Sequence, residues 1–387
     1  MPDIKFEPSQ SLTLGVEIEL QLLDQETYDL RPSALELIDI VGDKHPKIKP
    51  EIFQSMLEVN TEVCSDVHHV KNCISQTFSE LNTACNQIGI KYATTGTHPF
   101  ARYSERILYP LPRYNELIDR NQWIARRLSI FGLHVHIGIE SQEECIGLMN
   151  FMQHFLPQLA ALSCSSPFWQ SKDTGLYSSR LSVFEASPTS GHCDYIKDWQ
   201  TFSNIVHTLK ECKAIKSTKD LWWDIRPAPH YGSLEIRICD GTATFHELLG
   251  IVAYIHVLAH YYHRYKNYPV ELFRLINNHE TFIPLWIIRE NKWRAMRHGI
   301  NMETIKHDGT TLLLKDDTFK NLEILKDIIS ELNYGEYIGY IINIFQYGNS
   351  ANRQLKKYKK AKSLRQVAKM NASECYESFL NNKNCII

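Results

Sequence analysis

The stretch Thr13–Leu22, with the sequence TLGVEIELQL, decides the fold because aliphatic and polar side chains alternate along it with a period of two. Successive side chains of a β-strand point to opposite faces of a sheet, so this period predicts a strand with one buried face. The buried face would hold Leu14, Val16, Ile18 and Leu20, and the opposite face Glu17, Glu19 and Gln21. We therefore expect a strand over Leu14–Leu22 that carries acidic side chains on one side.

Three more stretches show the same alternation: MLEVNTEV, LHVHIGI and SLEIRIC. They predict strands over Met56–Val63, His134–Glu140 and Leu234–Cys239. The aliphatic faces would hold Leu57, Val59, Thr61 and Val63, then Val135, Ile137 and Ile139, then Leu234, Ile236 and Ile238. The opposite faces would hold Glu58, Asn60 and Glu62, then His134, His136 and Gly138, then Ser233, Glu235 and Arg237.

The four polar faces together carry five carboxylates and two imidazoles, but one guanidinium and no lysine. A sheet with one face in water gives the same alternation, and this remains the alternative interpretation. An ordinary wet face mixes lysine, threonine and serine among its acids, however. If the four strands share a sheet, their like charges repel unless cations neutralise them. Carboxylate oxygens with a few imidazoles suit Mg²⁺ or Mn²⁺ better than Zn²⁺, so the pattern favours a divalent-metal site.

Amphipathic helical segments lie between these strands, for example Val70–Ile88 and Cys145–Cys164. Their order predicts an α+β fold and not alternating βαβ units. After about Asp317 the pattern is mainly helical, which suggests a catalytic domain over residues 1–317 and a C-terminal helical segment over 318–387, packed on the same domain. The lysine-rich stretch Gln354–Lys369 is interpreted as a solvated helix face.

Composition and local sequence features argue against nucleic-acid-binding, membrane-spanning and secreted proteins. A formal net charge of −2 argues against general nucleic-acid binding. The most apolar helical stretch, Phe245–Tyr262, is interrupted by polar residues, so we expect no membrane span. The start of the chain, MPDIKFEPSQ, shows no secretory signal, and ten cysteines, Cys385 among them, form no C-x-x-C pair. Reduced thiols in a cytoplasmic protein fit this usage better than a disulfide framework.

Six ordered motifs span nearly the whole chain: GVEIELQLLD, MLEVNTEVC, TGTHPF, FGLHVHIGI, LWWDIRPAPHYGSLEIRICDG and RENKWRAMRHG. In this order they resemble the carboxylate–amine ligases known as type 2 glutamate-cysteine ligases. The resemblance implies a glutamine synthetase-like fold, a curved antiparallel half-barrel with flanking helices. The concave face of that half-barrel would hold metals, nucleotide and glutamate, and it would be the polar face predicted above.

The resemblance also implies roles for individual residues. Glu19 and Glu58, with Glu51 as a third, resemble ligands of a metal near the acceptor substrate. Three further residues resemble ligands of a second metal, which bridges the ATP phosphates: Glu17, His136 and Glu235. Arg237 resembles the cation that meets the transferring phosphoryl group, and Arg226 resembles a clamp for a substrate carboxylate or phosphate. His134 would support His136 from the same face.

These roles imply an ATP-dependent ligase with Mg²⁺ or Mn²⁺ as cofactor. ATP would phosphorylate a carboxylate, and an amine would then displace phosphate to form an amide, with glutamate and cysteine as the simplest substrates and glutathione biosynthesis as the context. The absence of both a P-loop motif and a G-x-G-x-x-G fingerprint agrees with this. We expect small-molecule partners, no nucleic acid and no membrane, with a homodimer as the assembly to test.

Two other functions are compatible with parts of the sequence. A metal-dependent hydrolase could build a zinc site from the strand pair His134 and His136 and the helical pair His256 and His260. A non-catalytic protein of the same fold could bind glutamate or nucleotide, although such a protein would be expected to lose some of the ligands named above.

Overall fold

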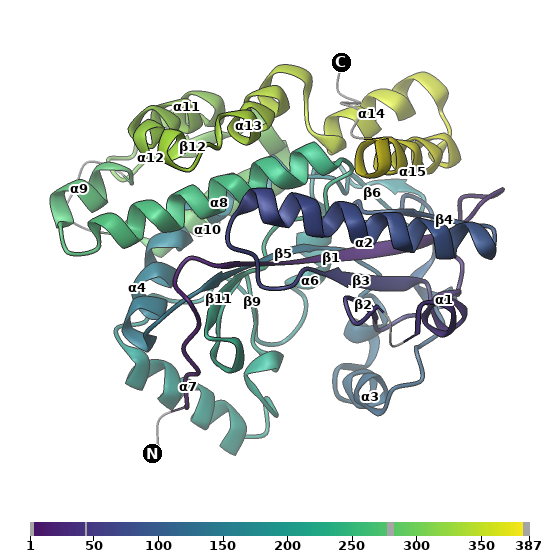
Figure 1. Ribbon diagram of the computed structural model, residues 1–387, viewed down its shortest axis with the longest axis horizontal. Helices are drawn as coiled ribbons and strands as arrows, with labels where there is room; N and C mark the ends of the chain where they lie inside the picture. Colours follow the sequence, from purple (N-terminus) through teal and green to yellow (C-terminus); the bar gives the residue numbers. More distant parts are fainter. Residues whose placement is uncertain (1–3, 43–44, 277–281, 382–387) are drawn as a thin grey trace.

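The computed structural model describes residues 4–42, 45–276 and 282–381. It is an α+β structure built on one antiparallel sheet, with helices packed around it (Figure 1). The strands of this sheet follow the order β10-β11-β5-β1-β3-β2, with β4 paired to the far end of β1. Their bounds are β10 Ile225–Ala228, β11 Ser233–Ile236, β5 Leu133–Gly138, β1 Leu14–Asp24, β3 Met56–Asn60, β2 Ile48–Pro50 and β4 Ile90–Ala93. The sheet does not close on itself, because β10 and β2 remain at its two edges.

The helices are α1 Ala34–Val41, α2 Val67–Gln87, α3 Pro112–Arg126, α4 Gln142–Met152, α5 Leu156–Ser163, α6 Ser179–Phe184, α7 Trp199–Glu211, α8 Phe245–Tyr265, α9 Pro269–Arg274, α10 Leu285–His298, α11 Leu314–Ile324, α12 Lys326–Glu331, α13 Gly335–Tyr347, α14 Ser350–Ala361 and α15 Leu364–Asn381. Three two-stranded pairs complete the structure: β6 Phe168–Trp169 with β7 Lys172–Asp173, β8 Ser190–Gly191 with β9 Trp222–Trp223, and β12 Glu303–Ile305 with β13 Thr311–Leu313.

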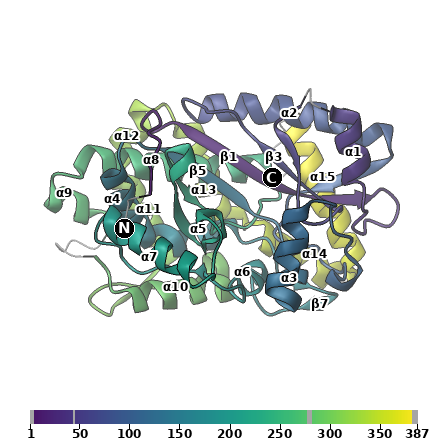
Figure 2. The same ribbon diagram turned by 90° about the horizontal axis from the view of Figure 1, so that it is seen from below.

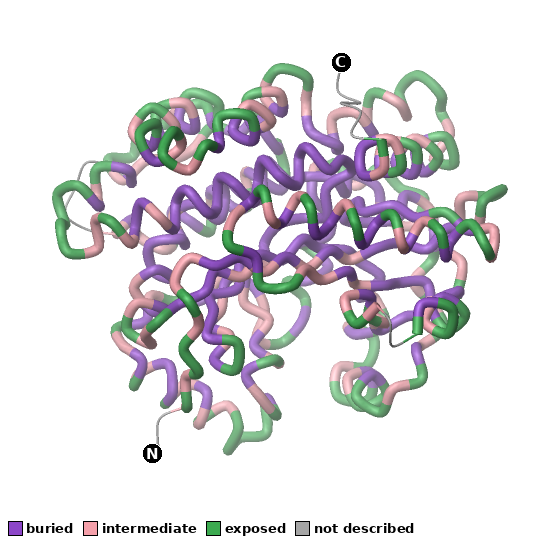
Figure 3. The backbone as a smooth tube through the Cα atoms, in the orientation of Figure 1, coloured by how far each residue is buried: buried purple, intermediate pink, exposed green. Residues whose placement is uncertain are grey.

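The predicted sheet is confirmed: β1, β3, β5 and β11 are neighbours in one sheet, each within a few residues of its expected bounds. Leu14, Val16, Ile18 and Leu20 are at most 1% exposed. Helices α2 and α8 pack against this aliphatic face, and α15 packs against β4. Figure 3 shows the strands and most of α8 as buried. Burial of aliphatic surface between sheet and helices therefore fixes which face of the sheet remains for polar side chains.

The prediction for Met56–Val63 was wrong at its end. Strand β3 stops at Asn60, and Val63 is 69% exposed. Between the pairs Glu17↔Asn60 and Leu14↔Cys64, β1 has two residues and its partner has three. An extra residue of this kind is a β-bulge and interrupts the alternation, so Glu62 and Val63 leave their predicted faces.

Two long helices begin at side-chain caps. Helix α8 starts with a reciprocal capping box between Thr244 and Glu247, and Asp66 caps α2 by accepting a hydrogen bond from the backbone N–H of His69 at 2.8 Å. Such caps satisfy N–H groups that a helix cannot pair internally. Among the described residues, no helix combines the length and the apolar character needed to cross a bilayer.

The chain after Asp317 is helical, as predicted, and α13 packs along α8 while α15 packs on α2 and β4. The expected boundary at residue 317 falls inside α11, and the division into residues 1–317 and 318–387 stays a prediction. Residues 382–387 of that segment, with Cys385, lie outside the described residues. The lysine-rich stretch occupies α14 and the start of α15.

Candidate active site

The sheet face opposite the covering helices carries the predicted acids and bases. We call it the polar face and define it by Glu17, Glu19, Glu58, His134, His136, Arg226, Glu235 and Arg237. In the view from below, α7, α6 and α3 lie along one side of β1 and β5 (Figure 2). Strand register sets the pairs on this face: Arg226↔Glu235, Glu235↔His136, Glu17↔His134 and Glu19↔Glu58. The structure therefore brings together side chains separated by up to about two hundred residues in the chain.

Glu17, His136 and Glu235 form a compact cluster, with one ligand atom from each lying within 4.8 Å of the others. Nε2 of His136 is 3.4 Å from Glu17, while its Nδ1 lies 2.9 Å from the hydroxyl of Ser233. Nδ1 of His134 lies 3.2 Å from Glu17. Burial opposes ionisation of Glu17, but the contacts with the two histidines outweigh it and hold the pKa of Glu17 well below its usual value.

Two arginines hold Glu235, which is 2% exposed. Nε and Nη2 of Arg226 donate to its two oxygens at 2.7 and 3.3 Å, and Nη1 of Arg237 donates to Oε1. Burial alone would raise the pKa of Glu235, but the two guanidinium groups lower it below its usual range. This part of the polar face therefore has its negative charge largely compensated by the protein itself.

Among the residues that the structure describes, a second acidic group, Glu19, Glu51 and Glu58, lacks the arginine ion pairs that Glu235 has. Glu19 and Glu58 are directly opposite each other on β1 and β3, and Glu51 follows β2, the next strand. Burial, with the charges of Glu17 and Glu51, raises the pKa of Glu58 well above normal. Burial and the charge of Glu19 raise the pKa of Glu51 to about 7. Within the described ranges, no lysine or arginine nitrogen lies within 4.0 Å of these three carboxylates.

The charge of Arg113 lowers the pKa of Glu51 in part, but among the described residues it forms no ion pair with these carboxylates. Crowded carboxylates without an ion-pair partner are the donor set that hard divalent cations bind. The arrangement of Glu19, Glu51 and Glu58 thus fits a cation, because the raised pKa values of Glu51 and Glu58 mean that their ionisation is unfavourable in the protein alone. Glu17, His136 and Glu235 also fit, with ligand atoms already converged. The fifth carboxylate of the sequence pattern, Glu62, does not belong here: after the bulge it pairs with Lys47 and His69.

Sequence reasoning missed Arg180, which lies on α6 and is 2% exposed. Its Nη2 donates to the carbonyl of Arg237 at 3.4 Å, and the guanidinium groups of both arginines lie against the ring of Phe184, at 5.7 and 5.9 Å from its centre. A Cβ added at Gly132 would be 2.3 Å from Nη2 of Arg180 and 2.9 Å from Nε2 of His134. Arg180 therefore reaches the polar face, and the glycine makes room for it.

Two buried guanidinium donors on this side have no hydrogen-bond partner among the described residues: Nε of Arg180 and Nε of Arg237. Arg180 also has no carboxylate within ion-pair distance in the described ranges. Unpaired buried donors are costly, so their concentration at one place indicates a site for an anion. No strand periodicity could have revealed Arg180, because it comes from a short helix after a loop.

A buried ion pair supports Arg237 from behind. Lys292, on α10, is 3% exposed and places Nζ 2.6 Å from Asp224 and 2.5 Å from Glu185. The carbonyl of Asp224 accepts a hydrogen bond from the backbone N–H of Arg237 at 2.8 Å. The motif RENKWRAMRHG thus contributes a lysine that fixes the backbone from which Arg237 projects.

The zinc site of the hydrolase alternative does not form. His256 lies on α8, on the aliphatic side of the sheet, where its ring nitrogens contact the carbonyl of Leu12 and the hydroxyl of Tyr334, both at 2.8 Å. His260 contacts His256. The sheet therefore separates these two histidines from His134 and His136, so the geometry does not support the alternative of a zinc site built from both pairs.

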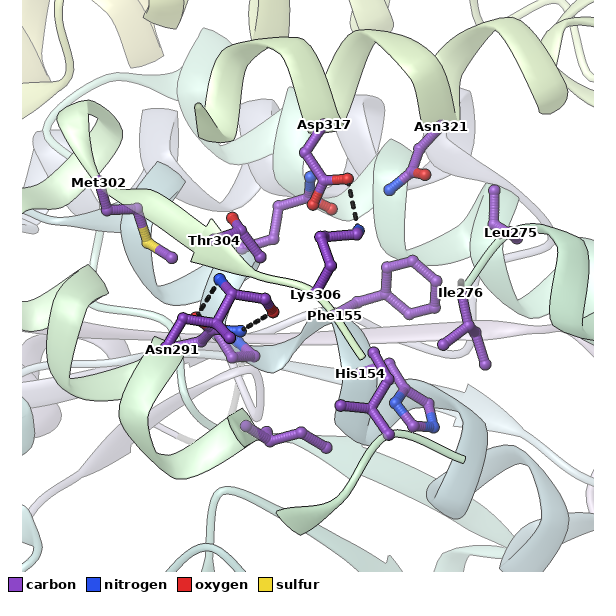
Figure 4. Close-up of a pocket in the computed structure, with 15 residues that line it drawn as sticks. His154, Phe155, Leu275, Ile276, Asn291, Met302, Thr304, Lys306, Asp317 and Asn321 are labelled. Atoms are coloured by element: carbon purple, nitrogen blue, oxygen red, sulfur yellow. Dashed lines mark hydrogen bonds and ion pairs between the residues drawn. The ribbon is translucent and has the colours of Figure 1, made fainter. Parts of the chain in front are cut away.

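A small cavity lies elsewhere, among α5, α10, α11 and β12 (Figure 4). Its volume is about 30 Å³, and its wall includes the ion pair Lys306–Asp317 at 2.7 Å. Asn291 on the same wall exchanges hydrogen bonds with the backbone of Ile305. This volume suits a water molecule and is too small for a nucleotide or an amino acid, so the cavity does not compete with the polar face as the site.

Comparison with known proteins places the chain in a family. The model of glutamate-cysteine ligase family 2 matches residues 13–376. A protein from Bdellovibrio bacteriovorus, named provisionally as a glutamate–cysteine ligase 2, is 43% identical over 340 residues, 88% of each chain. A protein from Gloeobacter violaceus with the same provisional name is 38% identical over 371 residues, covering 93% of this chain and 96% of its own.

Solved structures share the fold at low sequence identity. Glutamate–cysteine ligase from Francisella tularensis, in complex with AMP, superposes with a TM-score of 0.64 at 12% identity, covering 98% of this chain and 92% of its own. A bifunctional glutathione synthetase from Pasteurella multocida gives a TM-score of 0.63 at 14% identity, covering 95% of this chain and 53% of its own. With the matched family over nearly the whole sequence, these findings identify the chain as a member of glutamate-cysteine ligase family 2, an enzyme that forms a carbon–nitrogen bond between a carboxylate and an amine.

Proposed function

We propose that this enzyme joins the γ-carboxylate of glutamate to the amine of cysteine, using ATP and giving γ-glutamylcysteine, ADP and phosphate. The observation that carries the proposal is the polar face itself, with an acidic group ready for cations beside three arginines. Synthesis of an acyl phosphate brings a carboxylate and a triphosphate together, and both are anions. A site for this chemistry needs many positive charges, supplied in part by bound metal.

The chain's own residues divide this work. Glu17, His136 and Glu235 would hold one divalent cation, and Glu19, Glu51 and Glu58 another. When bound, Mg²⁺ or Mn²⁺ neutralises phosphate and carboxylate charge. Ser233 orients His136 by contacting its Nδ1 at 2.9 Å, which leaves Nε2 directed to the cluster.

The arginines act on the transferred group. We propose that Arg237 contacts the γ-phosphoryl group as the glutamate carboxylate attacks phosphorus and ADP leaves. Arg226 binds a carboxylate or phosphate beside it, and Arg180 supplies unpaired donors from α6. The cysteine amine then attacks the acyl carbon, phosphate departs, and the nitrogen loses a proton to give the amide. Planar guanidinium groups suit this task because they bind two oxygens of a phosphate at once.

The remaining details belong to the same proposal. We propose Mg²⁺ as the working ion with Mn²⁺ as a substitute, a cytoplasmic enzyme of glutathione biosynthesis, and small molecules as its partners. A homodimer is proposed as the assembly, to be tested by light scattering. The catalytic unit is proposed to be residues 1–317 with the helices of 318–387 as a C-terminal segment.

The test is a product assay. Purified protein with ATP, Mg²⁺, glutamate and cysteine should release phosphate and form γ-glutamylcysteine, identified by mass spectrometry. Glu235→Gln should abolish the product, because it disturbs the cluster and both arginines. Glu62→Gln is the matched control, since Glu62 follows the same strand pattern yet lies off the polar face, and it should retain activity. Absence of any amide across a panel of amino-acid carboxylates and amines would refute the proposal, and a better amine in that panel would replace cysteine.

A further inference from the structure

A second chemically distinctive cluster lies away from the polar face, where α2 meets the ends of the sheet. It consists of Cys64, Cys73 and Lys47. Cys64 follows the β-bulge after β3 and pairs with Leu14, the first residue of β1, through two backbone hydrogen bonds of 2.8 Å. Cys73 lies in α2, and Lys47 precedes β2. None of these residues has a part in the proposed reaction.

The three side chains contact one another. Nζ of Lys47 donates to the sulfur of Cys73 at 3.3 Å, and the thiols of Cys64 and Cys73 lie close enough together for each to shift the pKa of the other. Cys64 also lies 3.4 Å from the carbonyl of Glu62, whose carboxylate is 3.4 Å from Nζ of Lys47. A cation therefore faces Cys73 directly and does not face Cys64.

This arrangement divides the roles of the two thiols. The hydrogen bond from Cys64 and the charge of Lys47 outweigh burial and hold the pKa of Cys73 well below its usual value. The same hydrogen bond and burial raise the pKa of Cys64. Cys73 is thus the thiolate and Cys64 the thiol. Cys85, on the same helix, is 1% exposed, and burial alone raises its pKa to about 12.

We propose that Cys64 and Cys73 form a redox modification site that a small peroxide converts to an intramolecular disulfide. In the first step the Cys73 thiolate attacks one peroxide oxygen, the O–O bond breaks, and Cys73 becomes a sulfenic acid as hydroxide leaves. The thiol of Cys64 then attacks the sulfur of Cys73, forming the S–S bond and releasing water. Two thiols lose two electrons in total, and the peroxide accepts both.

The burial of both sulfur atoms determines which oxidant can reach them. Cys73 is 5% exposed and Cys64 is fully buried, so a bulky disulfide cannot align with either sulfur, whereas hydrogen peroxide is about as small as water. The closeness of the two thiols favours condensation over further oxidation. Since Cys64 is bonded to the start of β1, the new bond would tie α2 to the strand that carries Glu17 and Glu19.

The experiment treats the reduced, purified protein with hydrogen peroxide at pH 7, blocks free thiols, and maps peptides without reduction. Cleavage after Lys71 separates Cys64 from Cys73, while Cys73 and Cys85 share one tryptic peptide, so fragmentation must localise the link. We expect a Cys64–Cys73 disulfide that a dithiol reverses, with Cys85 remaining free. Cys85 thereby serves as the internal control. Failure to find this link, or a link through Cys85, would overturn the proposal.

Two variants test the separate roles. Cys64→Ala removes the resolving thiol, so Cys73 should stop at the sulfenic acid, which dimedone traps once the protein is unfolded. Lys47→Gln removes the cation from a partly exposed side chain and should slow oxidation at pH 7 at least tenfold, with a rate that recovers as pH rises. A Lys47→Gln variant that reacts as fast as the parent would contradict the assignment, as would Cys64→Ala without a trapped adduct. Neither readout depends on ligase activity.

Discussion

Replacing Glu51 by glutamine should stabilise the metal-free protein, even though Glu51 is proposed as a metal ligand. The carboxyl of Glu51 lies among other acids, and burial with the charge of Glu19 raises its pKa from 4.5 to about 7. Glutamine keeps the size of the side chain and removes the charge. A substitution that damages the site should therefore strengthen the fold when no cation is present.

The magnitude follows from the pKa of Glu51. A shift from 4.5 to about 7 corresponds to a free-energy difference of about 3 kcal/mol between the two protonation states. Because the folded pKa is the higher one, the folded state binds more protons between pH 4.5 and 7, so the parent loses this stability as pH rises through that window. At pH 8 the metal-free Glu51→Gln protein should melt roughly 4 °C above the parent, and the two should converge near pH 4.5.

Bound metal should offset most of this stability difference between the parent and Glu51→Gln. Mg²⁺ at about a hundred times its Kd adds roughly 2.7 kcal/mol by mass action to a protein that binds it only when folded. Melting curves with EDTA and with Mg²⁺ should show this gain in the parent and a smaller one in Glu51→Gln. Glu62→Gln, off the polar face, is the control and should respond to metal as the parent does. Equal metal responses in parent and Glu51→Gln, or a metal-free variant less stable than the parent at pH 8, would refute the reasoning.

Three further predictions follow from other parts of the site and core. Arg237→Lys should lower kcat by orders of magnitude with the fold intact, because an ammonium is a point charge where a guanidinium presents a planar fork, and near-normal turnover would remove Arg237 from the mechanism. Arg180→Met should leave the melting temperature unchanged or higher but raise the KM for ATP, since a buried guanidinium that forms no ion pair among the described residues serves an anion; an unchanged KM would count against it. Burial keeps His98 and His256 neutral, with pKa values of about 4 and about 3, so the unfolded chain gains protons first as pH falls below 6.5. Protonation of each histidine in the unfolded chain should lower the free energy of unfolding by about 3 kcal/mol by pH 4. His98→Gln should therefore flatten the acid limb of a curve of melting temperature against pH.

The strands and their polar face could be predicted from sequence because a period of two is a local property. Each pattern assigned its residues to faces before any pairing was known, and burial of Leu14 or Val135 confirms this. The period of two gave the wrong faces after Asn60, because one extra residue in a bulge reverses the face assigned to each later residue of the stretch. It also could not find Arg180, whose α6 helix reaches the sheet only through tertiary packing. Lys292 belonged to a recognised motif, but its ion pair with Asp224 joins residues 68 positions apart.

The distribution of charge on the polar face explains why its two acidic groups should differ in their need for metal. Glu235 is held by Arg226 and Arg237, so it can remain ionised without a cation, and a bound cation would compete with those arginines. Among the described residues, Glu19, Glu51 and Glu58 form no ion pair with an arginine, and burial together with neighbouring charges raises the pKa values of Glu51 and Glu58. The strand patterns placed Glu19, Glu58 and Glu235 on one face, and the family resemblance added Glu51. Neither could distinguish the two groups, because Arg226 reaches Glu235 only through the pairing of β10 with β11. Thermal stability should consequently depend on metal mainly through the uncompensated group, whereas activity should depend on both.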